Sequence, residues 1–159
     1  MDRPLRPYQI DACNAIDREW ANVRSTLLVL ATGLGKTRTA AEIIKRRIDA
    51  GTGRVLWIAH RSELITQARD AIMENVSDIR VGIEKADSYA NTYALHEMHD
   101  HVVVASVQTL HEKRRTRFSP GLFGTVIIDE GHHATARTYR EIIDHFPDVG
   151  ASLGHRLTI

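Results

Sequence analysis

The sequence has little that would place the protein outside the cell or in a membrane. It contains a single cysteine, Cys13, so no disulfide can form within one chain. No apolar run approaches the roughly 20 residues that span a bilayer. The N-terminal stretch, with Asp2, Arg3 and two prolines, is not a secretory signal. We therefore expect a cytoplasmic location and no membrane partner.

Net charge is nearly absent as well. The 21 basic and 20 acidic residues leave a formal charge of +1, which by itself gives no argument for nucleic-acid binding. The rest is ordinary for one globular domain, since 43% of the 159 residues are hydrophobic and 26% are charged. The case for a function must therefore come from local motifs.

Short apolar segments alternate with amphipathic ones along the chain, a pattern typical of buried parallel strands joined by helices. We assign strands to 26–30, expected to be fully buried, and to 54–59, 79–83, 101–105 and 125–128, with the start of another at 157–159. Helices are assigned from Pro7 to about Trp20, from Thr37 onward and over 134–146. The pattern predicts an α/β fold with an open, mainly parallel sheet and helices on both faces.

A glycine-rich loop lies between the first strand and the helix that follows it. Gly33 and Gly35 allow a tight turn that aims backbone N–H groups inward, and the helix N-terminus adds partial positive charge. Lys36 stands where a lysine reaches the β and γ phosphates of a nucleotide, and the Thr37 hydroxyl stands where it coordinates Mg²⁺. The predicted nucleotide-binding residues of this segment are Thr32, Gly33, Leu34, Gly35, Lys36, Thr37 and Arg38.

Two adjacent carboxylates, Asp129 and Glu130, follow the apolar strand at 125–128. Because the carboxyl ends of parallel strands meet at one edge of a sheet, we expect both residues to lie near the glycine-rich loop. Asp129 would hold the magnesium ion, and Glu130 would orient and deprotonate the attacking water. Loop and carboxylates together predict a site for ATP and Mg²⁺.

Both stretches resemble motifs of superfamily 2 helicases and translocases, which are DEAD/DEAH-like proteins. The string A-T-G-L-G-K-T at 31–37 resembles motif I, in which the first glycine of the P-loop pattern is often replaced, here by Leu30. The string D-E-G-H at 129–132 resembles motif II, D-E-x-H, with Gly131 at the variable position. The resemblance implies a RecA-like fold, ATP hydrolysis, and a role for His132 in coupling the ATP site to the nucleic acid.

The string L-R-P-Y-Q-I-D-A at 5–12 resembles the adenine-reading element that precedes motif I in that superfamily. A glutamine amide can donate to and accept from the N6 and N7 edge of adenine, so Gln9 is the candidate for base selection. Arg6 or Tyr8 would then lie against the ring face. The alternative is that Gln9 is a solvated side chain in the first helical turn.

Two further strings, each at a strand end, resemble motifs that contact a nucleic-acid backbone. H-R-S-E-L at 60–64 resembles motif Ia, and A-S-V-Q-T-L at 105–110 resembles motif Ib. The implied nucleic-acid contacts are His60, Arg61, Ser106, Gln108 and Thr109. As alternatives, Ser62 and Ser106 cap helices while Arg61 is solvated, and the basic run 113–117 either touches nucleic acid or is a solvated loop.

The resemblance covers nearly the whole chain. It implies that residues 1–159 form the first RecA-like domain of a superfamily 2 helicase or translocase, ending at the start of motif III near Thr158. The motifs look like the branch of type I and type III restriction motor subunits and of DNA-repair and phage helicases, which favours DNA over RNA.

The second RecA-like domain, which supplies an arginine finger in the family, is absent from the sequence. We therefore expect weak ATP hydrolysis and no unwinding by this chain alone. An RNA helicase, a nucleotide kinase, and a nucleic-acid-binding module with a regulatory nucleotide site stay open as alternatives.

Overall fold

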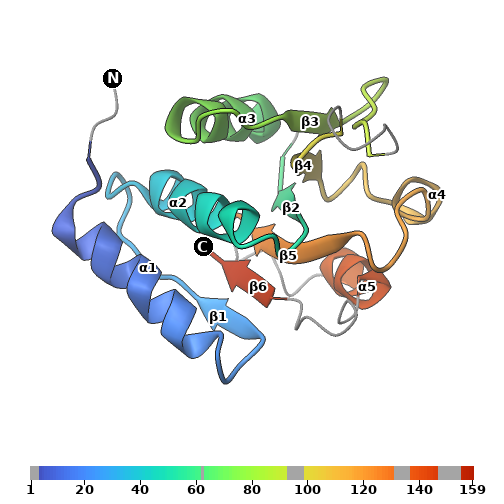
Figure 1. The fold of residues 1–159 in the computed structure, drawn as a ribbon. Helices are drawn as coiled ribbons and strands as arrows, with labels where there is room; N and C mark the ends of the chain where they lie inside the picture. Colours follow the sequence, from blue (N-terminus) through green and yellow to red (C-terminus); the bar gives the residue numbers. More distant parts are fainter. Residues whose placement is uncertain (1–3, 62, 93–98, 131–136, 147–154) are drawn as a thin grey trace.

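The computed structural model describes residues 4–61, 63–92, 99–130, 137–146 and 155–159, and they form an open sheet with helices on both faces (Figure 1). The strands are β1 (Ser25–Leu27), β2 (Arg54–Ala59), β3 (Val81–Glu84), β4 (Val102–Ser106), β5 (Phe123–Ile128) and β6 (His155–Thr158). Their order across the sheet is β1-β6-β5-β2-β4-β3, and each neighbouring pair is parallel. The predicted α/β class with an open parallel sheet is confirmed.

The helices are α1 (Pro7–Glu19), α2 (Lys36–Asp49), α3 (Glu63–Asn75), α4 (Glu112–Arg115) and α5 (Arg137–His145). The first three cover one face of the sheet, while α4 and α5 lie on the other (Figure 1). Among the described helices, none is long and apolar enough to cross a membrane.

Side chains of the central strand β2 alternate between two cores. Val55, Trp57 and Ala59 pack with residues of α1, α2 and α3, whereas Leu56 and Ile58 pack with residues of α5. All five are fully buried, because β2 lies between β5 and β4 and has helices on both of its faces. A continuous apolar run is what such a strand requires.

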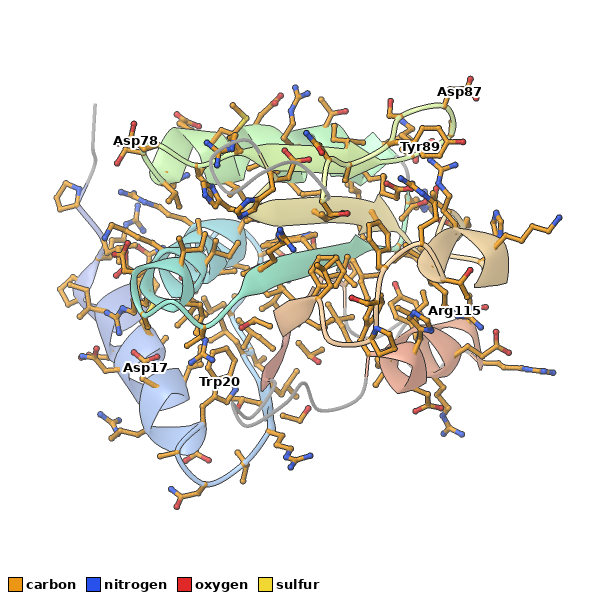
Figure 2. The ribbon with its side chains drawn as sticks, turned by 45° about the vertical axis from the view of Figure 1, so that its right-hand side comes forward. Asp17, Trp20, Asp78, Asp87, Tyr89 and Arg115 are labelled. Carbon is orange, nitrogen blue, oxygen red and sulfur yellow. The ribbon has the colours of Figure 1, made fainter. Side chains whose placement is uncertain are left out.

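The helices α1 and α2 are joined by charged and aromatic contacts as well as by the core. Asp17 of α1 forms an ion pair with Arg46 of α2 at 2.6 Å. Trp20, at the end of α1, lies 5.3 Å from the Arg47 guanidinium carbon, measured to the ring centroid. Asp17 and Trp20 can be followed along α1 in Figure 2. These contacts fix α1 next to the helix that carries the phosphate loop.

The first strand differs from the sequence prediction. β1 ends at Leu27, and it lies at the edge of the sheet with β6 as its neighbour. Leu28 is buried against the helices, but Leu27 is 66% and Val29 is 78% exposed. The expectation of a fully buried strand over 26–30 is therefore wrong, because an edge strand is paired on one side and the described helices leave one face of β1 uncovered.

The other predicted strands are present, with ends shifted by at most two residues, and β2 has the predicted bounds. α5 begins at Arg137, whereas the predicted helix began at 134, and residues 134–136 lie outside the described part of the chain. Since all strands are parallel, their carboxyl ends lie at one edge of the sheet. The segments with the predicted site residues follow β1, β2, β4 and β5 at that edge.

Candidate functional site

The glycine-rich loop turns sharply between β1 and α2. Gly33 and Gly35 have φ angles of 82° and 79°, in the left-handed region that favours glycine. Gly35 is the N-cap of α2, and the Leu34 N–H donates to the Ala31 carbonyl at 3.1 Å. The first N–H groups of a helix have no partner within the helix. The N-terminus of α2 therefore presents N–H groups and partial positive charge beside the loop, which suits a polyphosphate.

Two side chains of α1 hold the loop in place. Gln9 is buried, and its Nε2 donates to the carbonyl oxygens of Leu34 at 3.2 Å and Gly35 at 3.4 Å. The Tyr8 hydroxyl donates to the same Leu34 oxygen at 3.0 Å, and Gln9 Oε1 accepts the Arg6 N–H at 2.9 Å. The alternative of a solvated Gln9 is wrong. Adenine contact by Gln9, Arg6 or Tyr8 stays a prediction.

A cavity of about 420 Å³ lies between the start of α1, α2 and the end of α3. Pro4, Leu5 and Ile10 give it an apolar wall, and Arg38 of α2 lines another side. Arg38 is one of the predicted nucleotide-binding residues. Glu42, Lys45, Arg46 and Asn75 complete a lining that is mostly polar.

The two predicted carboxylates stand at the carboxyl end of β5. The Asp129 N–H donates to the Ile58 carbonyl at 2.9 Å, which anchors this end of the strand to β2. Asp129 Oδ1 accepts the Glu130 N–H at 2.9 Å. Glu130 has a φ of 57°, an uncommon backbone conformation for a residue other than glycine.

Burial raises the pKa of Asp129 above its ordinary value, and the nearby charge of Lys36 opposes that shift. The strand order places β6 between β1 and β5, and all three strands are parallel, so the phosphate loop after β1 and the carboxylates after β5 lie at the same edge of the sheet. Lys36 and Thr37 are half-buried at the start of α2. His132 lies outside the described residues.

Thr37 and Asp129 supply the hydroxyl and carboxylate oxygens that Mg²⁺ prefers. In the described part of the chain, no group of three or more His, Cys, Asp or Glu side chains could hold a metal ion. Magnesium is usually bound by one or two carboxylates together with substrate phosphates rather than by a cage of protein ligands. The residues present fit a magnesium ion that is held jointly with a nucleotide.

A groove of about 590 Å³ lies at the same edge of the sheet, beyond β2, β4 and β3. It is lined by Arg61, Glu63, Lys85, Ser106, Gln108 and Thr109, among others. Four of the five predicted nucleic-acid residues are thus brought together. His60, which is half-buried, is not in that lining, and Lys85 was not predicted.

Ser106 has a structural task at the end of β4. Its hydroxyl lies 2.8 Å from the Thr109 hydroxyl and accepts the Thr109 N–H at 3.1 Å. This is the capping-type interaction considered as the alternative for Ser106. Gln108 and Arg61 are exposed, and Ser62 lies outside the described residues.

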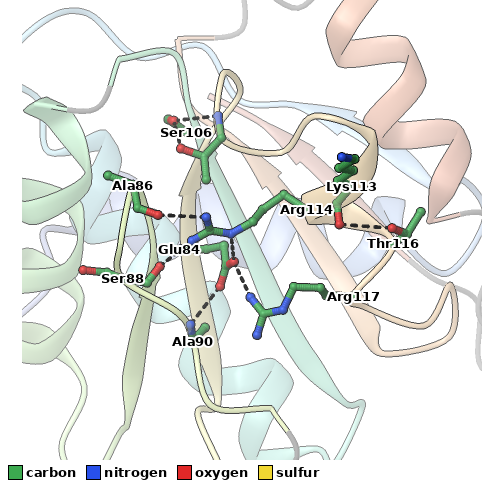
Figure 3. A network of polar contacts seen from close by, with 10 residues as sticks. Glu84, Ala86, Ser88, Ala90, Ser106, Lys113, Arg114, Thr116 and Arg117 are labelled. Carbon is green, nitrogen blue, oxygen red and sulfur yellow. Dashed lines mark hydrogen bonds and ion pairs between the residues drawn. The ribbon is translucent and has the colours of Figure 1, made fainter.

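The basic run 113–117 is not simply a solvated loop, because two of its arginines form ion pairs with a buried carboxylate. Arg114 and Arg117 both pair with Glu84 of β3, whose side chain is fully buried (Figure 3). The sequence analysis missed this contact, because Glu84 ends a strand that is remote in sequence from the arginines. An acidic residue at the end of an apolar strand was the one available signal.

Comparison with known proteins finds similarity to restriction-enzyme subunits and to a helicase. A family model described as "Type III restriction enzyme, res subunit" matches residues 2–151. IRC3 of Saccharomyces cerevisiae, a candidate ATP-dependent helicase, is 34% identical over 149 residues, which are 89% of this chain and 21% of that protein. The type I restriction enzyme EcoAI endonuclease subunit of Escherichia coli is 28% identical over 146 residues, which are 89% of this chain and 18% of that protein.

Among solved structures, the SWI2/SNF2 ATPase core of Sulfolobus solfataricus in complex with double-stranded DNA is similar with a TM-score of 0.74 and 13% identity. The similarity covers 99% of this chain and 32% of that one, and at this identity it shows the fold alone. The chain spans about a fifth of the length of the two curated relatives. With its RecA-like fold and a family match over most of its length, the chain belongs to the Type III restriction enzyme Res-subunit family, as an N-terminal RecA-like domain of superfamily 2 helicases.

Proposed function

We propose that this chain is the ATP-hydrolysing motor domain of a helicase or translocase, which couples turnover of Mg-ATP to binding of nucleic acid and movement along it. The observation that carries the proposal is the convergence at one sheet edge of the loop after β1 and the carboxylates after β5. Both segments follow parallel strands that are separated in the sheet only by β6, and this strand order supports the convergence.

Each residue of the site has one task in this proposal. Lys36 neutralises charge on the β and γ phosphates, while Thr37 and Asp129 hold the metal ion. Glu130 accepts a proton from the attacking water and orients it. Its positive φ is the kind of strained backbone that persists where the surrounding structure fixes a functional geometry. Mg-ATP, when bound, supplies the divalent charge and the phosphoryl group that is transferred.

The groove beyond β2, β4 and β3 is the proposed contact for the nucleic-acid backbone. Arg61 supplies a cation, and Ser106, Gln108 and Thr109 supply neutral donors, the mixture found at sugar–phosphate contacts. DNA is favoured over RNA because one relative is a subunit of a restriction endonuclease. The adenine base is proposed to lie beside Arg38, in the cavity that Pro4, Leu5 and Ile10 also line.

We further propose that a second RecA-like domain, in the same or another chain, completes the site with an arginine finger. In related NTPases such an arginine contributes about 10³ to 10⁵ in rate, so turnover by this chain alone should be slow.

The test is ATP turnover by the chain with and without single-stranded DNA, duplex DNA and RNA, with Lys36→Ala as the blank. Stimulation by one polymer that disappears in Lys36→Ala would support a nucleic-acid-coupled motor and identify its polymer. Glu130→Gln should retain nucleotide binding and lose turnover. Turnover equal in wild type and Glu130→Gln would contradict the hydrolytic role and favour a regulatory nucleotide site.

A further inference from the structure

A buried ionic cluster stands behind one wall of the proposed nucleic-acid groove. Glu84, the last residue of β3, has no exposed side-chain surface. One of its oxygens pairs with Arg114 Nε and with Arg117 Nη1, the latter at 2.6 Å. The other accepts the Ala90 N–H at 2.8 Å. Figure 3 shows both guanidinium groups converging on this carboxylate.

Arg114 also contacts the segment 85–90, which follows β3. Its Nη1 donates to the Ala86 carbonyl at 2.8 Å, and its Nη2 donates to the Ser88 carbonyl at 2.7 Å. Its guanidinium carbon lies 3.9 Å from the centroid of the Tyr89 ring, a cation–π contact. One side chain of α4 therefore holds three successive parts of this segment while its Nε is paired with Glu84.

The segment 85–90 is itself a tight turn. The Lys85 N–H donates to the Ser88 carbonyl at 3.0 Å, and the Ser88 N–H donates back to the Lys85 carbonyl at 2.6 Å. The first two residues of the turn, Lys85 and Ala86, line the groove. What Arg114 fixes is therefore the groove wall itself.

The strand order places this wall relative to the other groove residues. β4 lies between β2 and β3, so the segment after β4, with Ser106 and Thr109, is flanked by Arg61 after β2 and by Lys85 after β3. The two cations thus stand on either side of the hydroxyl and amide donors, and they outnumber the one carboxylate of the lining, Glu63. Cations on both sides of neutral donors suit a chain of successive phosphates better than one isolated phosphate.

We propose that Lys85 binds a backbone phosphate of single-stranded nucleic acid in this groove, and that the Glu84–Arg114 pair positions Lys85 for that contact. The inference rests on the proposed function and adds to it a contact that no sequence motif identified. Lys85 touches the ligand, whereas Arg114 and Glu84 act through the segment 85–90.

The direct test compares Lys85→Ala with Lys113→Ala. Lys113 is an exposed lysine on α4 outside the groove lining, so its removal changes net charge equally. Binding of a fluorescein-labelled oligothymidylate is measured over a range of salt concentrations. Lys85→Ala should weaken binding about five- to ten-fold, as expected for one lost charge-assisted contact. The slope of log affinity against log salt should fall by about 0.7. Lys113→Ala should bind as wild type does.

The positioning role is tested by a double-mutant cycle with Arg114→Lys, which keeps the positive charge and loses the contacts to Ala86 and Ser88. Arg114→Lys alone should weaken oligothymidylate binding. In the Lys85→Ala background it should have no further effect, because it acts through Lys85. Equal losses in both backgrounds would overturn the positioning role. A loss of folding would instead appear as a lowered unfolding midpoint and loss of binding to a fluorescent ATP analogue.

Arg61→Ala separates failure of this inference from failure of the proposed function. If Arg61→Ala weakens oligothymidylate binding and Lys85→Ala does not, the groove stands and the contact by Lys85 is refuted. If the wild-type chain binds no oligothymidylate, or if neither substitution changes the affinity, the proposed groove itself is refuted.

Discussion

Gly35 combines two requirements at one residue of the phosphate loop. Its φ of 79° disfavours any side chain, and a Cβ at this position would lie 2.6 Å from Gln9 Nε2. Gly51 has a φ of 66° at the end of α2, but a Cβ there would meet no atom within 4 Å. A side chain would be strained at either position, but only at Gly35 would it also meet Gln9.

Gly35→Ala should therefore destabilise the protein and also weaken nucleotide binding. We expect a loss of about 1–2 kcal/mol in the free energy of unfolding from the strained φ, and at least a ten-fold loss of affinity for a fluorescent ATP analogue. Gly51→Ala should show a similar loss of stability with unchanged nucleotide affinity. Unchanged nucleotide affinity in Gly35→Ala would contradict the role given to the Gln9 contact.

Tyr139 of α5 is almost fully buried, and its hydroxyl has no hydrogen-bond partner among the described residues. Burial, assisted by the charges of Asp129 and Glu130, raises the pKa of Tyr139 to about 12. A buried polar group without a partner costs about 1–3 kcal/mol. Tyr139→Phe should therefore raise the free energy of unfolding in a urea titration. A decrease would mean that the hydroxyl makes an interaction that stabilises the fold.

Asp129 gives a pH dependence whose sign follows from its raised pKa. Because the folded state holds the Asp129 proton more tightly than the unfolded state does, this residue lowers stability as pH rises above its ordinary pKa of 3.8. Asp129→Asn should thus be more stable than wild type at pH 7, and the difference should shrink as pH falls towards 3.8. Urea unfolding at several pH values measures it. A difference that grows in acid would refute the assignment.

At the scale of the element, burial decides how the segment that directly follows the edge strand β1 responds to substitution. Val29→Thr should change the free energy of unfolding by less than about 0.5 kcal/mol, because the side chain is mostly exposed. Leu28→Ala should cost about 2–5 kcal/mol, because Leu28 packs in the core with α1 and α2. Chemical denaturation of both variants tests the contrast. A large loss in Val29→Thr would show that the Val29 side chain is covered in the folded protein.

The elements also show what local sequence can predict. β2 was predicted to the residue, because an apolar run between turn signals is typical of a strand that is buried on both faces. The run over 26–30 is similarly apolar, but the burial of such a run depends on how many strands and helices lie next to it. Strand order is a property of the whole sheet, so the run over 26–30 contained no sign that β1 lies at an edge.

The nucleotide site and the proposed nucleic-acid groove also differ in how far local sequence predicts them. The phosphate loop and the Asp129–Glu130 pair are contiguous motifs whose chemistry can be read from a few adjacent residues. The contact between Glu84 and Arg114 joins β3 to α4, and Lys85 reaches the groove because β3 is a neighbour of β4. Such contacts follow from the assembled sheet, and no local pattern predicted them.

For the whole molecule, ligand binding should add to the stability of the fold. A ligand that binds the folded state alone stabilises it by RT ln(1 + [L]/Kd), about 1.4 kcal/mol at ten times Kd. A non-hydrolysable ATP analogue with Mg²⁺ should therefore raise the Tm of wild type in a concentration-dependent way. Lys36→Ala should show little shift, and an equal shift in the variant would place the nucleotide elsewhere.

The strand order has a further consequence in time rather than in space. β1 pairs with β6, so residues Ser25 to Leu27 find their partner in a strand that is synthesised after all the other described strands. Such long-range pairing is slow to form, because a large loop must close first. During translation, β2, β4 and β5 can assemble before β6 emerges from the ribosome. The central strands of the nascent chain should therefore pair first. The phosphate-binding loop after β1 should reach its final position only when β1 pairs with β6.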